Sequence, residues 1–161
     1  MDIRKGVPWN ALTKNELLKA ERTMVHGSVI TLQTKGFSDM HDITGSVRKI
    51  IDASPVENGI VVVSVIGSTA SVSTIEYEGA LVADVQEQLE KMVPHTMRSR
   101  HSETWGDDNG FSHIRATLMG PSLTLPVADG EPVLGTWQQI VVIDHDNRPR
   151  TRNVYVQIMG E

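Results

Sequence analysis

The chain has 161 residues, of which 39% are hydrophobic, and this size fits one compact domain with a single core. It contains no cysteine, so disulfides, thiolate nucleophiles and cysteine-rich zinc motifs are excluded, and any metal site must use His, Asp, Glu or water. Fifteen Lys and Arg against twenty Asp and Glu give a net charge of -5, which argues against nucleic acid as a partner because phosphate backbones attract basic surfaces.

The pattern of apolar residues argues against a membrane partner. The longest apolar run, residues 59–67, is too short to cross a bilayer. The charged start of the chain leads into no apolar segment of the signal-peptide type. We therefore expect a cytoplasmic protein.

Residues 1–25 differ in pattern from the rest and are expected to form an N-terminal arm, with one domain over residues 26–161. Within the arm, Thr13 and Glu16 have the spacing of a capping box, and a short helical pattern of apolar residues extends from there to Met24. We expect this arm to pack on a neighbouring part of the protein.

The first elements of the domain follow from hydrophobic spacing. Alternation over residues 26–34 predicts a strand, and one-face apolar spacing after Thr44 predicts a helix that Thr44 caps and that stops near Pro55. Residues 59–66 are apolar on both faces, as in a central strand. A second strand follows them and leads to Glu76.

The clearest amphipathic helix of the sequence covers residues 81–92 and is stopped by Pro94. A long polar stretch, 95–113, follows it and reads as a functional loop. Further strands are predicted at residues 113–119, 122–125, 135–143 and 152–159. This order favours an α+β domain with antiparallel sheets over a repeated βαβ unit.

The polar stretch contains the first candidate site. His101 and His113 are able to ligate a divalent ion, with Asp107, Asp108 or Glu76 supplying oxygen, because imidazole and carboxylate suit zinc, manganese and similar ions. No fixed motif requires this spacing. The alternative is that both histidines lie on the surface of a charged loop.

A second candidate is the junction at residues 67–70, between two predicted strands. Backbone N–H groups there, with the hydroxyls of Ser68 and Thr69, suit an anion such as phosphate. The alternative is a plain strand turn in which Gly67 supplies an unusual backbone conformation.

Three arginines near the C-terminus, Arg148, Arg150 and Arg152, form a third candidate. Guanidinium groups bind phosphate through paired hydrogen bonds, so these residues are suited to clamp a phosphorylated ligand. The alternative is an exposed cluster of ion pairs.

A series of short motifs makes the sequence recognisable. In chain order they are Gly67–Ala70, Thr74–Glu78, Trp105–Gly110, Ser112–Ala116, Gly135–Gln138 and Asp146–Arg152. Together they resemble the YjbQ-like family, often labelled secondary thiamine-phosphate synthase. The resemblance covers about residues 26–160, and several blocks in the right order are more specific than any one of them.

The resemblance implies a single-domain α+β fold with a β-sandwich core, assembled as a homotrimer with a metal-associated pocket near the subunit boundaries. The recurrent histidines of the family match His101 and His113, and its recurrent glutamate matches Glu76. The chain departs from the family pattern at Gly67 and Ile75, where many members have His and Asn. These departures mark a subgroup and put a histidine-dependent role at position 67 in doubt.

The activity attached to the family is the joining of a pyrimidine pyrophosphate to a thiazole phosphate, giving thiamine phosphate. Such chemistry asks for cationic groups or a metal to neutralise the departing pyrophosphate and for oriented donors to hold the second phosphate. The resemblance therefore implies a divalent cofactor, with zinc first and magnesium or manganese as alternatives, and a phosphorylated small molecule as partner. The rival hypotheses are a non-catalytic trimer that binds a phosphorylated metabolite and a metal-dependent phosphate-ester hydrolase.

Residues are assigned to roles on this basis. The metal ligands are His101, His113 and Glu76, with Asp108 as the alternative carboxylate. The catalytic candidates are Glu76, Asp108 and His113. The candidates that bind substrate are Ser68, Thr69, Asn109, Trp137, Arg150 and Arg152. Trp105 is a second candidate for a pocket wall that stacks on a ring, and trimer packing is the alternative role for both tryptophans.

Overall fold

The computed structural model describes residues 23–161. Its strands are β1 (Met24–Thr34), β2 (Asp39–Asp42), β3 (Gly59–Ile66), β4 (Ala70–Ile75), β5 (Ser122–Ala128), β6 (Glu131–Pro132), β7 (Gln139–Asp144) and β8 (Arg150–Gly160). Its helices are α2 (Thr44–Asp52), α3 (Gly79–Met92), α4 (Arg100–Trp105) and α5 (Gly110–Met119). The helix expected in the arm falls outside the described residues, except at Met24, which begins β1.

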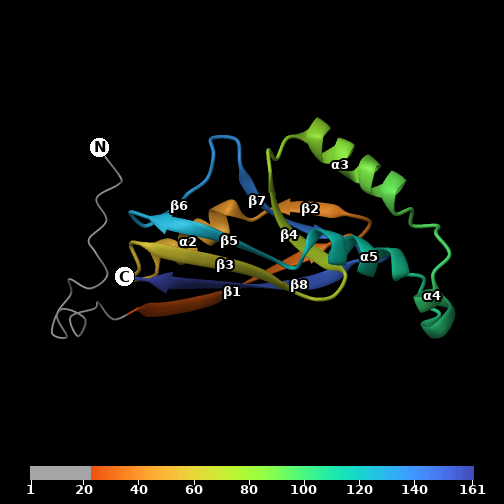
Figure 1. Ribbon diagram of the computed structural model, residues 1–161, viewed down its shortest axis with the longest axis horizontal. Helices are drawn as coiled ribbons and strands as arrows, with labels where there is room; N and C mark the ends of the chain where they lie inside the picture. Colours follow the sequence, from red (N-terminus) through yellow and green to blue (C-terminus); the bar gives the residue numbers. More distant parts are fainter. Residues whose placement is uncertain (1–22) are drawn as a thin grey trace, which may run out of the picture.

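The strands form two antiparallel sheets, which Figure 1 shows one above the other. One sheet has the order β1-β8-β3-β5-β6 and the other has the order β2-β7-β4. The longest ladder joins β1 to β8 and pairs Met24 with Gly160 at one end and Thr34 with Arg150 at the other. β3 lies in the middle of the larger sheet, as expected for the strand at residues 59–66.

Alternating side chains explain why the two sheets share one core. In β3 and β8 every second residue is buried, because successive side chains of a strand point to opposite faces. The residues buried on one face of the smaller sheet and on α2 join the same cluster. The core members include Val47, Ile51, Val61, Val63, Val72, Ile140, Val142, Val156 and Ile158. The prediction of one α+β domain built mainly from antiparallel strands is confirmed.

The opposite face of the larger sheet is exposed in a single chain. We call it the outer sheet face, and its large apolar members are Val25, Val29, Ile60, Ile66 and Tyr155. The strand at residues 59–66 is apolar on both faces, yet only one face is buried within the described residues.

Two predicted strands are corrected. Residues 113–119 are not a strand but belong to α5. The apolar residues there alternate as in a strand, but the helix buries Phe111 and Arg115, which are four positions apart, on one face. The segment 95–113, read as a loop, contains α4 and the start of α5. The strand predicted at 135–143 begins later, with β7, because residues 135–138 form a turn.

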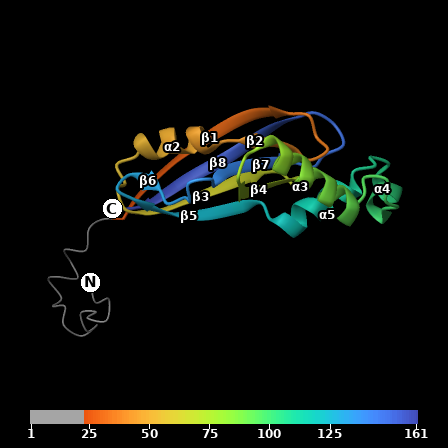
Figure 2. The same cartoon turned by 90° about the horizontal axis from the view of Figure 1, so that it is seen from above.

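The helices end up at different places around the sheets. α3 covers the smaller sheet, where Val82 and Val85 pack on a second cluster of Met40, Val141 and Ile143. Figures 1 and 2 agree that α4 and α5 lie at the end of the molecule away from the C-terminus. Among residues 23–161, no helix has the length and hydrophobicity that crossing a bilayer requires.

Candidate functional site

The structure brings His101 and His113 together at the end of the molecule formed by α4 and α5. Their ring centroids lie 4.6 Å apart with the planes at 64°. Nε2 of His101 lies 3.5 Å from a carboxylate oxygen of Asp107. α4 and α5 thus bring the two imidazoles close together, and the loop between these helices places the Asp107 carboxylate beside His101.

Local sequence explains how α4 and α5 come so close. The Ser99 hydroxyl caps α4 by accepting a hydrogen bond from the Ser102 N–H. Gly106 ends α4 in the left-handed conformation with φ of 70°, which lets the chain reverse. Gly110 begins α5 against the Ser99 side chain, at a distance that leaves no room for a Cβ atom. The two helix starts are therefore fixed against each other.

The predicted metal shell is not assembled within these residues. Over residues 23–161, no group of three or more His, Asp or Glu side chains is close enough to hold a metal ion. The carboxylate beside His101 belongs to Asp107, whereas Asp108 lines a different hollow. The described residues of one chain therefore do not fit a complete metal site.

Glu76 and Trp137 lie elsewhere, near the end of β4. Glu76 follows β4, and the next residue, Tyr77, donates its backbone N–H to the Gln139 side chain at 2.8 Å. Trp137 belongs to the turn before β7 and is 70% exposed. α3, which is roughly 21 Å long at 1.5 Å per residue, separates this region from α4. Glu76 therefore does not join the two histidines within one chain.

A hollow of about 460 Å³ lies beside the His101–Asp107 pair, and we call it the arginine hollow. Its lining residues are Gly106, Asp107, Asn109, Asn147, Arg148 and Arg150. They come from the loop between α4 and α5 and from the turn between β7 and β8, which the Asn147 side chain joins by donating to the Asp107 carbonyl at 2.7 Å. The volume falls in the range of small-molecule sites.

The two arginines of this hollow are held differently. Arg150 donates from Nε to Asp146 Oδ2 at 2.7 Å, which leaves its two terminal nitrogens for another partner. Burial works to raise the pKa of Asp146, but hydrogen bonds from Arg150, Thr69 and the Asn147 N–H outweigh it and lower that pKa. No carboxylate among residues 23–161 lies within ion-pairing distance of the exposed Arg148.

Two of the residues expected to bind phosphate lie in the interior instead. Arg152 forms a two-pronged ion pair with Asp144, with distances of 2.8 Å and 2.6 Å. It also donates to the Thr69 hydroxyl, which donates in turn to Asp146 at 3.0 Å. Thr69 and Arg152 are buried, Nε and Nη2 of Arg152 are engaged in these bonds, and neither residue lines the arginine hollow. We call these four residues the buried ion-pair network.

Ser68 remains exposed and lies near one of the histidines. With Gly67 and His113 it lines a smaller hollow of about 210 Å³. Gly67 has no side chain, and a Cβ atom built there would lie 2.9 Å from a guanidinium nitrogen of Arg152. A side chain at position 67 would therefore press on the buried Arg152.

Sequence reasoning missed the buried histidine at the end of β7. His145 is fully buried, with Nδ1 2.9 Å from the Ser38 hydroxyl and Nε2 2.6 Å from the Ser71 hydroxyl. Arg115, also buried, donates to the same Ser38 hydroxyl at 3.0 Å and to Glu90 at 2.6 Å. Burial, with the nearby Arg115 charge, lowers the pKa of His145 to about 4, so this imidazole is neutral at pH 7.

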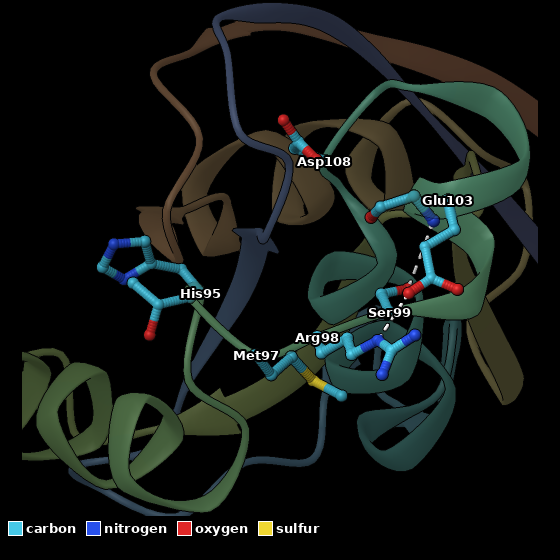
Figure 3. A pocket seen from close by; sticks show the side chains of 8 residues that line it. His95, Met97, Arg98, Ser99, Glu103 and Asp108 are labelled. Atoms are coloured by element: carbon cyan, nitrogen blue, oxygen red, sulfur yellow. Dashed lines mark hydrogen bonds and ion pairs between the residues drawn. The ribbon is translucent and has the colours of Figure 1, made fainter.

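A further hollow of about 460 Å³ lies on the other side of the loop between α4 and α5. Figure 3 shows His95 on one side of it and Glu103, in an ion pair with Arg98, on the other. Asp108 also lines it, in a left-handed conformation with φ of 50°. Asp107 and Asn109 face the arginine hollow, so the loop turns successive side chains to opposite sides.

Comparison with known proteins agrees with the resemblance found in the sequence. The family described as UPF0047 protein YjbQ-like matches residues 28–161. A UPF0047 protein of Methanothermobacter thermautotrophicus is 35% identical over 137 residues, covering 85% of this chain and 94% of the relative. A UPF0047 protein of Archaeoglobus fulgidus is 35% identical, covering 81% of this chain and 98% of the relative.

Solved structures give the same result. A YbjQ-like protein of unknown function from Sulfolobus solfataricus matches with a TM-score of 0.82 and 31% identity, covering 87% of this chain and all of that one. A YjbQ/UPF0047 family protein of Clostridium acetobutylicum matches with a TM-score of 0.75 and 32% identity, covering 81% of this chain and 98% of that one. The chain belongs to the YjbQ-like UPF0047 family.

Proposed function

We propose that the protein binds a phosphorylated small molecule in the arginine hollow. The observation that supports this most directly is that the guanidinium of Arg148 and the two terminal nitrogens of Arg150 have no hydrogen-bond or ion-pair partner among residues 23–161 and lie side by side in the lining. Guanidinium groups match phosphate oxygens in charge and geometry. The carboxylate of Asp107 is the one anionic group in the lining, and it lies next to His101.

The family resemblance supplies a specific reaction for this hollow. In it, a ring nitrogen of a thiazole phosphate attacks the methylene carbon of a pyrimidine pyrophosphate, the carbon–oxygen bond breaks, and pyrophosphate departs. Arg148 and Arg150 would stabilise the charge that develops on the departing group. His113 or His101 would act as a general acid that donates a proton to an oxygen of the departing pyrophosphate. Ser68, beside His113, is a candidate donor to the second phosphate.

Binding is tested by titrating the purified full chain with inorganic pyrophosphate in a calorimeter. We expect measurable affinity for the wild type and at least a tenfold loss in Arg148→Ala. The matched control is Arg48→Ala, because Arg48 is an exposed arginine on α2, paired with Glu131 and outside the hollow. Equal affinity in all three proteins would overturn the proposal.

Catalysis is tested separately, by incubating the protein with the two precursors and measuring thiamine phosphate by mass spectrometry. We expect the product with the wild type and loss of turnover in His113→Ala with an unchanged melting temperature. Binding without product would identify a non-catalytic binding protein. Release of inorganic phosphate from a phosphate ester would identify a hydrolase.

We also propose that a divalent cation accompanies the ligand, with zinc ahead of magnesium or manganese. His101 and His113 supply two imidazoles, and the remaining ligands have to come from outside this group. Elemental analysis of the purified protein tests the idea. One zinc per chain in the wild type, lost in His101→Ala, is the expected result, and metal-free wild type after purification in zinc would contradict it.

A homotrimer is the third part of the proposal. The outer sheet face supports it, because contiguous exposed apolar residues mark sites of association. Analytical ultracentrifugation of the full chain is expected to give three times the mass of one chain. Replacing Val29 by Lys, on the edge strand β1 of that face, is expected to shift the mass towards the monomer.

A further inference from the structure

A hollow lined by carboxylates lies near the C-terminus, at the end of the molecule away from α4 and α5. Its volume is about 510 Å³, and we call it the acidic hollow. The end of α2, the segment that follows α2 and the turn between β5 and β6 form it, and Figures 1 and 2 show these elements together. Its lining residues are Ile51, Asp52, Ser54, Val56, Glu57, Asp129, Gly130 and Glu131.

The fold holds the acidic hollow in shape. The Gly130 N–H donates to the Glu57 carbonyl at 2.9 Å, which ties the turn between β5 and β6 to the segment after α2. Asp129 and Gly130 have φ of 52° and 73°, as a two-residue hairpin turn requires. Ile51 and Val56 belong to the buried core. The carboxylates are therefore gathered by a fixed backbone.

Most of the charge in the acidic hollow is unbalanced. Glu131 forms an ion pair with Arg48. The side chains of Asp52, Glu57 and Asp129 form no ion pair or hydrogen bond within the part of the chain that the structure describes, and all three are exposed. Like charges gathered on one surface add up to a negative potential. The acidic hollow is therefore suited to a cationic partner.

The N-terminal arm joins the domain beside the acidic hollow. Thr23, the first described residue, lines a neighbouring hollow of about 330 Å³ together with Asn58. Asn58 follows Glu57, and its side-chain oxygen accepts a hydrogen bond from the Asp129 N–H at 3.4 Å. The chain therefore enters the domain next to two of the unpaired carboxylates.

The arm also has the opposite charge. Residues 1–22 contain five Lys and Arg against three Asp and Glu, whereas residues 23–161 contain ten against seventeen. In the helix predicted after Thr13, Lys19 and Arg22 are three positions apart and so share one side. Because the arm is tethered to β1, its docking is intramolecular, and contacts too weak to join separate molecules suffice.

We infer that residues 1–22 dock on the acidic hollow of their own chain, with Lys19 and Arg22 against its unpaired carboxylates. This gives a place to the packing that the sequence leads us to expect of the arm. The outer sheet face is a different kind of surface, because its large exposed members are apolar and its expected partner is a second copy. The inference goes beyond the proposed function, since the acidic hollow and the arginine hollow lie at opposite ends of the molecule.

Disulfide trapping in the full chain tests this inference, and the introduced thiols are the only ones because the sequence has no cysteine. One protein carries Ala20→Cys in the arm and Ser54→Cys in the acidic hollow. The control protein carries Ala20→Cys and Ser122→Cys, because Ser122 begins β5 and lies roughly 20 Å from the turn at the other end of that strand. Free thiols and intact mass are followed during oxidation. We expect the first pair to close within one chain at least tenfold faster than the control pair.

A second measurement tests the role of charge. Glu57→Lys, added to the Ala20 and Ser54 cysteine pair, is expected to slow closure at least threefold. Sodium chloride at about 0.5 M is expected to slow it as well, because salt screens exposed charges. The matched control is Asp84→Lys, which reverses an exposed carboxylate on α3 outside the acidic hollow. Melting temperatures are measured for every variant, so that closure rates are compared among folded proteins.

Three results would overturn the inference. Equal closure rates in the two cysteine pairs would mean that the arm does not dock on the acidic hollow. A disulfide between chains, seen as twice the mass of one chain, would mean that the arm docks on a second copy. Closure that neither salt nor Glu57→Lys slows would mean that charge does not direct the arm.

Discussion

The arginine hollow and the buried ion-pair network use the same kinds of side chain from the same stretch of sequence. They differ in whether the arginines have carboxylate partners among the described residues. In the network, Arg152, Asp144 and Thr69 bond to one another, and little hydrogen-bonding capacity remains. In the hollow, Arg148 has no carboxylate partner within the described residues. The comparison teaches that a free cation next to a cavity, rather than a count of arginines, points to a ligand.

The strongest way to test this difference is to remove Arg152. In Arg152→Ala, Asp144 stays buried without its cation and Asp146 keeps only Arg150, which costs about 3–5 kcal/mol of unfolding free energy. Urea denaturation of the wild type and the variant measures the loss. Arg152→Met keeps the bulk and is expected to lose nearly as much. A loss below about 1 kcal/mol would show that the network is not structural.

A pH series tests the buried His145. The pKa of His145 is about 4 in the folded protein, below its ordinary value of 6.5. As the pH falls, the unfolded chain therefore binds a proton at this side chain before the folded protein does. Stability is therefore full above pH 6.5 and falls as the pH drops towards 4, by up to about 3 kcal/mol. Denaturation curves between pH 7 and pH 4.5 are expected to show this slope.

The matched variant for the pH series is His145→Gln. It is less stable overall, because Gln cannot reproduce both serine contacts, but its stability is expected to lose the slope between pH 6.5 and 4.5. Asp146 and Glu90 have lowered pKa values and add their effect only at more acid pH. An unchanged slope in the variant would assign the pH dependence to another group.

Removing a buried hydroxyl is expected to change the unfolding free energy less than the variants above, and to raise it rather than lower it. Ser112, in the first turn of α5, has no hydrogen-bond partner for its side chain among the described residues. Removing an unsatisfied buried hydroxyl relieves its desolvation cost, so Ser112→Ala is expected to be neutral or more stable by up to about 1 kcal/mol. A destabilisation of more than about 1 kcal/mol in urea would mean that the hydroxyl has a partner in solution.

The smallest effect is expected at Arg148. Because this side chain is exposed and has no ion-pair partner among residues 23–161, Arg148→Ala should change the unfolding free energy by less than about 0.5 kcal/mol. The same variant is expected to lose pyrophosphate affinity, as described above. If Arg148→Ala is stable but fails to bind pyrophosphate, the arginine hollow serves binding rather than stability, unlike the buried ion-pair network. A large loss of stability would mean that Arg148 has a structural role, as Arg152 is expected to have.

Local patterns in the sequence were enough to predict most of the helices and strands of the described residues. Alternation identified β1, a run that is apolar on both faces identified β3, and one-face spacing identified α2 and α3. β5 and β8 were predicted as strands bounded by turn residues. Residues 113–119 of α5 were predicted to form a strand because the buried face of the helix is not uniformly apolar. Beside Phe111 and Ala116 this face contains the charged residue Arg115. A buried arginine breaks the hydrophobic pattern on which such readings depend.

The candidate site was predicted only in part. His101 and His113, which belong to one polar stretch of the sequence, lie next to each other in the structure, and their role as metal ligands stays a prediction. Asp107 rather than Asp108 faces His101, and this depends on backbone turns at Gly106 and Asp108 that residue types do not reveal. The burial of Arg152 depends on partners far away in the sequence.

Gly110 illustrates how little freedom the site has. Its backbone rests on Ser99, the residue that caps α4, and the Gly110 N–H is directed to the hydroxyl of Ser102. A single methyl group at position 110 would wedge α4 away from α5 and carry one imidazole away from the other. The separation of the two histidines is thus set by a residue that has no side chain.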